Sequence, residues 1–235
     1  PLKDSRIRWQ SAVTAAGLAL LLALLVIFLM IKSGLAARVL DKPNQRSLHV
    51  VAIPRSGGLC FMPVVIVVAL AVNHGAEWPL LALAALLILV FAIDDIRSLS
   101  VVVRFGVQIV AAASVVFLAG NMPWALALFG LITIVWSMNV FNLMDGSNGL
   151  AAGMAVFGFG TYALVALDHG AISLAIIAAS VMGAVLGFLV FNFDPAKIFM
   201  GDAGSVPLGF LASGIGLLGW HREIWPGWFP MLVFS

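Results

Sequence analysis

Long apolar runs alternate with short polar segments along the whole chain. A helix needs about 20 apolar residues to cross the roughly 30 Å hydrocarbon layer of a bilayer. Eight runs approach or reach this length, and a ninth begins near Trp228: residues 11–31, 57–72, 79–93, 105–119, 123–141, 149–167, 171–191 and 205–220. The pattern therefore predicts an all-α fold, a polytopic transmembrane helical bundle with about nine spans.

Composition excludes a soluble globular protein. Of the 235 residues, 63% are hydrophobic and 9% are charged, and the mean hydropathy is +1.15, whereas about half of the residues of a soluble domain are apolar. We expect residues 1–235 to form a single integral membrane domain. The sequence starts at Pro1 and its ninth apolar run stops at Ser235, so we expect truncation at both ends.

Basic residues gather on one side of the predicted bundle. If each apolar run crosses the membrane, residues 32–56, 94–104, 142–148 and 192–204 share a side. That side holds eight of the twelve Lys and Arg residues: Lys32, Arg38, Lys42, Arg46, Arg55, Arg97, Arg104 and Lys197. Cytoplasmic loops carry the excess of Lys and Arg, so we expect this side to face the cytoplasm.

Three acidic clusters lie at the ends of apolar runs on the same predicted side. Asp94 and Asp95 close the run 79–93, and Asp202 lies in a glycine-rich turn before the run 205–220. Asn139, Asn142 and Asp145 recur every three residues, which places them on one flank of a helix. Polar groups at membrane depth are costly unless they are used. The clusters therefore predict one functional site.

Adjacent carboxylates such as Asp94 and Asp95 repel each other unless a cation or a base lies between them. Arg97 or Arg104 could be that base, and oxygen ligands of this kind also suit Mg²⁺ shared with substrate phosphates. The alternatives are a solvated pair at a helix end and, for Asp202, a simple helix N-cap.

The segment 41–58 is a second candidate region because it is basic and rich in turn residues. Lys42, Arg46, His49 and Arg55 could bind phosphate, and the glycines at 57 and 58 would let the backbone approach a ligand closely. The alternative is contact with anionic lipid headgroups by a juxtamembrane basic loop.

Taken in order, these segments resemble the polyprenyl-phosphate N-acetylhexosamine-1-phosphate transferases of glycosyltransferase family 4. Four blocks carry the resemblance: NQRSLH at 44–49 with PRSGG at 54–58, DDIRSLS at 94–100 with Arg104 and Gln108, NVFNLMDG at 139–146, and FMGDAGS at 199–205. One departure is Asn148, where relatives that make the peptidoglycan lipid precursor have Asp. This favours the branch that primes O-antigen or similar polysaccharides.

The resemblance implies that a UDP-linked N-acetylated sugar donates its sugar 1-phosphate to undecaprenyl phosphate and leaves UMP. It also implies Mg²⁺, with Mn²⁺ as the alternative, and a multi-pass protein of the bacterial inner membrane that contacts lipid, binds no nucleic acid and could form oligomers. We expect Asp94, Asp95 and Asp145 to be catalytic and Asp202 with Asp94 or Asp95 to bind the metal. The expected substrate-binding residues are Lys42, Asn44, Arg46, His49, Arg55, Arg104, Asn139, Asn142 and Asn148.

Two other functions remain open from the sequence. One is transfer of phospho-N-acetylmuramoyl-pentapeptide within the same family. The other is proton-coupled transport, because intramembrane carboxylates also mark ion pathways. A transporter would place its acidic residues near mid-membrane on broken helices, whereas these lie at helix ends.

Overall fold

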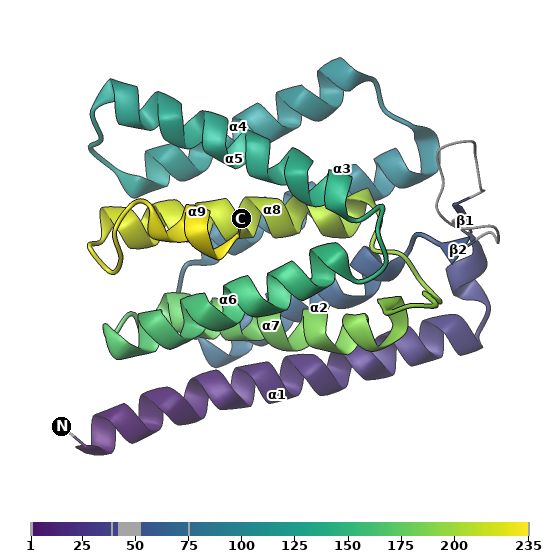
Figure 1. Cartoon of the computed structure of the whole chain (residues 1–235), viewed down its shortest axis with the longest axis horizontal. Helices are drawn as coiled ribbons and strands as arrows, with labels where there is room; N and C mark the ends of the chain where they lie inside the picture. Colours follow the sequence, from purple (N-terminus) through teal and green to yellow (C-terminus); the bar gives the residue numbers. More distant parts are fainter. Residues whose placement is uncertain (1, 39, 42–52, 75, 235) are drawn as a thin grey trace.

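A computed structural model describes residues 2–38, 40–41, 53–74 and 76–234, and helices make up most of this part of the chain (Figure 1). They are α1 (Leu2–Lys32), the 3₁₀ helix η1 (Leu35–Arg38), α2 (Gly57–Val72), α3 (Trp78–Arg97), α4 (Val101–Ala119), α5 (Trp124–Met144), α6 (Leu150–Asp168), α7 (Ile172–Asn192), α8 (Asp202–His221) and α9 (Phe229–Val233). Two short strands, β1 (Leu40–Asp41) and β2 (Ile53–Pro54), pair antiparallel. The predicted all-α bundle is confirmed.

Seven described helices are long and apolar enough to cross a membrane: α1, α3, α4, α5, α6, α7 and α8. The 16-residue α2 is apolar but shorter, and α9 covers five residues. The chain is therefore a multi-pass membrane protein. The predicted count of nine spans is not confirmed among the described residues, since the ninth run corresponds only to the short α9.

The acidic clusters lie at one end of the bundle, as the alternation of spans predicts. In Figure 1 the C-terminal ends of α3, α5 and α7 and the N-terminal ends of α4, α6 and α8 meet on the right, near β1 and β2. Successive helices run in opposite directions, so every second connection falls at this end. The fold thus gathers three distant segments of the chain in one region.

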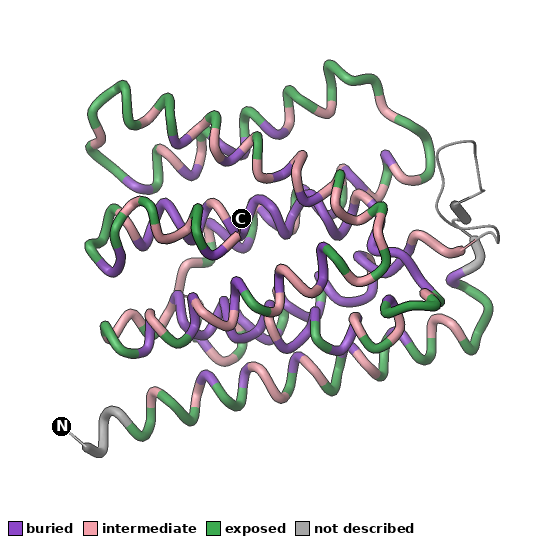
Figure 2. Tube along the Cα trace, in the orientation of Figure 1, coloured by how far each residue is buried: buried purple, intermediate pink, exposed green. Residues whose placement is uncertain are grey.

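Helix α8 forms the centre of the bundle. Of its apolar segment 89% is buried, against 22% for α1, α4 and α5, and Figure 2 shows this contrast along the trace. It packs against α3 and α5, where a side chain on Gly209 would lie 2.5 Å from the carbonyl oxygen of Ser137. Asp202 is the first residue of α8. The packing of α8 against its neighbours therefore holds the backbone of Asp202 inside the bundle.

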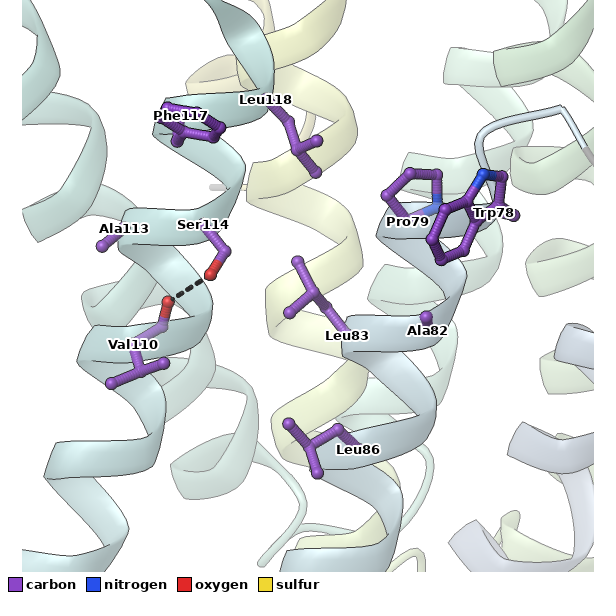
Figure 3. Close-up of a pocket in the computed structure, with 10 residues that line it drawn as sticks. All are labelled: Trp78, Pro79, Ala82, Leu83, Leu86, Val110, Ala113, Ser114, Phe117 and Leu118. Carbon is purple, nitrogen blue, oxygen red and sulfur yellow. Dashed lines mark hydrogen bonds between the residues drawn. The ribbon is translucent and has the colours of Figure 1, made fainter.

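A groove of about 670 Å³ lies between α3 and α4 at the end opposite to the carboxylates (Figure 3). Its lining is almost entirely apolar: Trp78, Pro79, Ala82, Leu83, Leu86, Val110, Ala113, Ser114, Phe117 and Leu118. The one hydroxyl among these residues, on Ser114, donates to the carbonyl oxygen of Val110 at 2.8 Å. The groove therefore suits lipid hydrocarbon and not a phosphorylated sugar.

Candidate active site

Three helix ends place four carboxylates around the start of α8. Asp94 and Asp95 lie in the last turn of α3, Asp145 follows the last residue of α5, and Asp202 opens α8. The helix starts three residues before the apolar run at 205–220, so Asp202 belongs to its first turn and not to a preceding loop. Because helix ends are decided by capping contacts, hydropathy alone placed this boundary too late.

Asp95 binds the backbone of α8 with both of its carboxylate oxygens. The amide of Asp202 donates to Oδ1 at 3.0 Å, and the amide of Ala203 donates to Oδ2 at 3.0 Å. These residues are more than 100 positions apart in the chain. The contacts tie the end of α3 to the beginning of α8.

Asp145 binds the residue just before α8. Its Oδ2 accepts a hydrogen bond from the amide of Gly201 at 2.9 Å. Burial raises the pKa of Asp145 from its ordinary 3.8 to about 7, although the Gly201 amide and the charge of Arg55 act in the opposite direction. Burial therefore disfavours the ionised form of this carboxyl group, and the contacts with Gly201 and Arg55 offset part of that effect.

Asp202 points toward α5 and α4. Its Oδ1 accepts a hydrogen bond from Nδ2 of Asn142 at 2.7 Å, and its Oδ2 lies 3.8 Å from Nη1 of Arg104. Asn142 also reaches the buried hydroxyl of Ser205 at 3.2 Å, and that hydroxyl donates to the carbonyl oxygen of Gly201 at 3.0 Å. The orientation of the Asp202 carboxylate is thus held from two sides.

Asp94 is 6% exposed and faces the same arginine. Its Oδ1 accepts a hydrogen bond from the amide of Leu99 at 2.6 Å, and its Oδ2 lies 3.5 Å from Nη1 of Arg104. The negative charge of Asp94 also acts on the Asp202 carboxyl group. Two carboxylates therefore converge with one guanidinium group, which is 39% exposed.

Two predicted amides lie elsewhere. Asn139 donates to Oε1 of Gln108 at 2.8 Å and to the carbonyl oxygen of Val135 at 2.7 Å, deeper along α5. Asn148 donates to Oδ1 of Asp194 at 2.7 Å and so joins two exposed turns. Of the three predicted asparagines on and after α5, Asn142 is the one with a recorded bond to the converging carboxylates.

The predicted basic region is described only in part. Lys42, Asn44, Arg46 and His49 lie outside the described residues. Arg55 is described, and its charge acts on both Asp145 and Asp202. Its carbonyl oxygen would lie 2.4 Å from a Cβ atom on Gly201. That glycine has φ of +72°, a conformation that also favours glycine, so no other residue suits this position.

Sequence reasoning missed Asn192, which is 2% exposed at the end of α7. Its Oδ1 accepts a hydrogen bond from the amide of Gly149 at 3.1 Å, and its Nδ2 donates to the carbonyl oxygen of Ile198 at 3.0 Å. The bonds fasten the loop before α8 to the start of α6. A lone polar residue between Phe191 and Phe193 was the available signal.

The described residues include no group of three His, Cys, Asp or Glu side chains arranged to hold a metal ion. The two carboxylates of Asp94 and Asp202 do fit a divalent cation chemically, since both lie near Nη1 of Arg104 and each adds to the negative charge that the other meets. Hard cations such as Mg²⁺ are commonly bound by one or two carboxylates plus substrate phosphates.

Comparison with known proteins agrees with this arrangement. Residues 78–219, more than half of the chain, match Glycosyl transferase family 4. The chain belongs to this family. The matched segment includes every converging side chain described above, from Asp94 to Asp202.

Two relatives illustrate the range of this family. A probable undecaprenyl-phosphate N-acetylglucosaminyl 1-phosphate transferase of Bacillus subtilis is 34% identical over 222 residues, 87% of this chain and 62% of that protein. A phospho-N-acetylmuramoyl-pentapeptide-transferase of Geobacillus thermodenitrificans is 45% identical over 98 residues, 42% of this chain and 30% of that protein. The chain thus spans less than two thirds of the length of these family members.

Proposed function

We propose that this protein transfers an N-acetylated sugar 1-phosphate from a UDP-sugar to undecaprenyl phosphate and so starts the assembly of a cell-envelope polysaccharide. The observation that carries the proposal is the convergence of Asp94, Arg104 and Asp202 at one end of the helical bundle in a member of this family. The relative that matches most of the chain favours N-acetylglucosamine as the sugar.

The reaction can proceed by direct attack, without a covalent bond between the substrate and the protein. An oxygen of the acceptor phosphate attacks the phosphorus attached to the sugar, the bond from that phosphorus to the bridging oxygen breaks, and UMP leaves with that oxygen. A phosphate monoester has its second pKa near 6, so the acceptor is mostly a dianion at neutral pH. Positioning and charge neutralisation then supply most of the rate, as in other phosphoryl transfers.

The side chains of the site divide this work. Arg104 would neutralise phosphate charge, because its guanidinium is 39% exposed where Asp94 and Asp202 converge. Asn142 orients Asp202 through the 2.7 Å hydrogen bond. Asp94 and Asp202 would hold Mg²⁺ or Mn²⁺, which when bound neutralises the donor diphosphate. Asp145 organises the segment that enters α8.

The charge distribution supports a cytoplasmic site. Arg55, Arg97, Arg104 and Lys197 lie at the end of the bundle that carries the carboxylates, and basic residues favour the cytoplasmic side. UDP-sugars are made in the cytoplasm, so the donor would reach the site directly. We therefore propose a multi-pass protein of the bacterial inner membrane with this end inside.

Transfer of phospho-N-acetylmuramoyl-pentapeptide is the second candidate, since a relative named for that activity is 45% identical over 98 residues. This match covers less than half of the chain. Transport is disfavoured because the carboxylates lie at helix ends and not on helices broken near mid-membrane.

The test is an assay of the intact protein in membranes, with undecaprenyl phosphate and a panel of UDP-N-acetyl sugars that includes UDP-N-acetylmuramoyl-pentapeptide. We expect release of UMP that depends on Mg²⁺ and on one of the sugars. Asp202→Asn should abolish it, while Asp168→Asn, an exposed carboxylate at the far end of α6, should not. Full activity of Asp202→Asn would disprove the assignment of this site.

A second measurement separates direct transfer from a covalent route. An aspartyl phosphate intermediate predicts isotope exchange between UMP and the UDP-sugar without any lipid acceptor. We expect no such exchange, because the acceptor phosphate is itself an adequate nucleophile.

A further inference from the structure

The first amides of α8 have an unusual set of partners. The N–H groups that open an α-helix have no acceptor within the helix and need one from outside. Here the amide of Gly201 donates to Asp145, and those of Asp202 and Ala203 both donate to Asp95. The amide of Gly204 donates to the carbonyl oxygen of Gly201 at 3.0 Å. All four amides are therefore satisfied.

Because its first amides are already paired, the start of α8 differs from an open helix N-terminus in its capacity to bind phosphate. An open helix N-terminus attracts phosphate through its free amides and the positive end of the helix dipole. In this protein a carboxylate from α3 already occupies that position, and a second carboxylate follows α5. These backbone amides are thus not available to the phosphates of a donor or acceptor.

The adjacent residues Asp94 and Asp95 therefore face different partners. Both oxygens of Asp95 accept backbone hydrogen bonds at 3.0 Å. Asp94 instead has an oxygen that lies 3.5 Å from Nη1 of Arg104, the same atom that lies 3.8 Å from Oδ2 of Asp202. Successive residues on a helix point about 100° apart, so neighbours in sequence can serve separate purposes.

We propose that Asp95 is a positioning residue, which caps α8 from another helix and so sets the place of the Asp202 carboxylate opposite Asp94, and that it is not a metal ligand. The role given to Asp202 rests on the proposed function, whereas the hydrogen bonds from the α8 amides to Asp95 do not depend on it. A shift of α8 by even a fraction of its first turn would move Asp202 relative to Arg104 and Asn142.

The sign of a stability change in metal-free protein tests this proposal. Asp95→Asn and Asp94→Asn are compared by thermal unfolding of the intact protein in detergent with chelator. Asparagine offers one acceptor in place of two and turns an NH₂ group toward a backbone amide. We expect Asp95→Asn to lower the unfolding temperature by about 3 °C or more. Asp94→Asn should lower it by less or not at all, because its Oδ1 can still accept from the Leu99 amide and the lost repulsion from Asp202 offsets the weaker contact with Arg104.

If Asp95 were a ligand crowded by other carboxylates and not a cap, its neutralisation would stabilise the metal-free protein. A higher or unchanged unfolding temperature for Asp95→Asn therefore overturns the proposal. Failure of Asp95→Asn to fold, when Asp94→Asn folds normally, supports it, since loss of the fold is the same effect in a stronger form.

Metal titration gives a second readout that does not depend on catalysis. Asp95→Asn keeps one oxygen, at the reach of the aspartate, that can accept from an α8 amide. We expect Mn²⁺ still to raise the unfolding temperature of Asp95→Asn, and to leave Asp202→Asn unaffected. Loss of the Mn²⁺ response in folded Asp95→Asn would overturn the proposal. A failure of UMP release in the unsubstituted protein would instead contradict the proposed function.

Discussion

Helices α2 and α8 meet backbone to backbone at Gly58 and Gly204, two residues from Asp202. A Cβ atom on Gly58 would lie 2.2 Å from the nitrogen and 2.4 Å from the Cα atom of Gly204, and 2.8 Å from the carbonyl carbon of Ala203. The amide of Gly58 also donates to the carbonyl oxygen of Met200 at 2.7 Å. We predict that Gly58→Ala separates the two helices at this point.

The size of the effect follows from these distances. A comfortable contact needs about 3.4 Å, so the backbones must part by about 1.2 Å in an interior that is closely packed. The obstructing atoms are backbone, which cannot rotate away, and overpacking of this kind costs about 1–3 kcal/mol. A displacement of about 1 Å at a catalytic group can lower a rate by about 100-fold.

UMP release and thermal unfolding measure the two consequences in the same preparation. Gly106→Ala and Gly153→Ala are matched controls, because a Cβ atom at either position would meet nothing within 4 Å. Alanine in a helix is favoured over glycine by about 0.5–1 kcal/mol, so these variants should be as stable as the unsubstituted protein or more so. A Gly58→Ala protein with unchanged rate and unfolding temperature would refute the reasoning.

Three further substitutions probe other contacts. Asn192→Ala should destabilise the protein by about 1–3 kcal/mol, because it leaves the buried carbonyl of Ile198 and the half-buried amide of Gly149 without this partner; an unchanged unfolding temperature would argue against that bond network. Asn142→Asp should abolish UMP release by placing a third negative charge against Asp202, and activity near the normal rate would contradict this. Arg222→Ala breaks the ion pair with Glu77 at the far end of the bundle. We expect the free energy of unfolding to fall by at most about 1 kcal/mol and UMP release to stay normal. A lower rate of UMP release would contradict the assignment of catalysis to the end that carries the carboxylates.

The helices and the common side of the acidic clusters could be predicted from the sequence. Apolar runs of bilayer length must become helices, because lipid offers no partner for backbone amides. Once each run is a span, the alternation of sides decides which connections meet. The ends of α3 and α5 and the start of α8 were therefore expected together. The boundary of α8 was not, because its first amides are capped by residues far away in the chain.

Hydropathy and the alternation of spans are enough to predict a helical membrane bundle with its carboxylates at one end. The contacts of each carboxylate follow only from how the helices pack. Asp94 and Asp95 are the same residue type in adjacent positions, so no pattern distinguishes them. The rotation along α3 turns one toward Arg104 and the other toward the amides of α8. Hydrogen bonds act over a few ångströms and depend on direction, so such assignments emerge only when the helices pack.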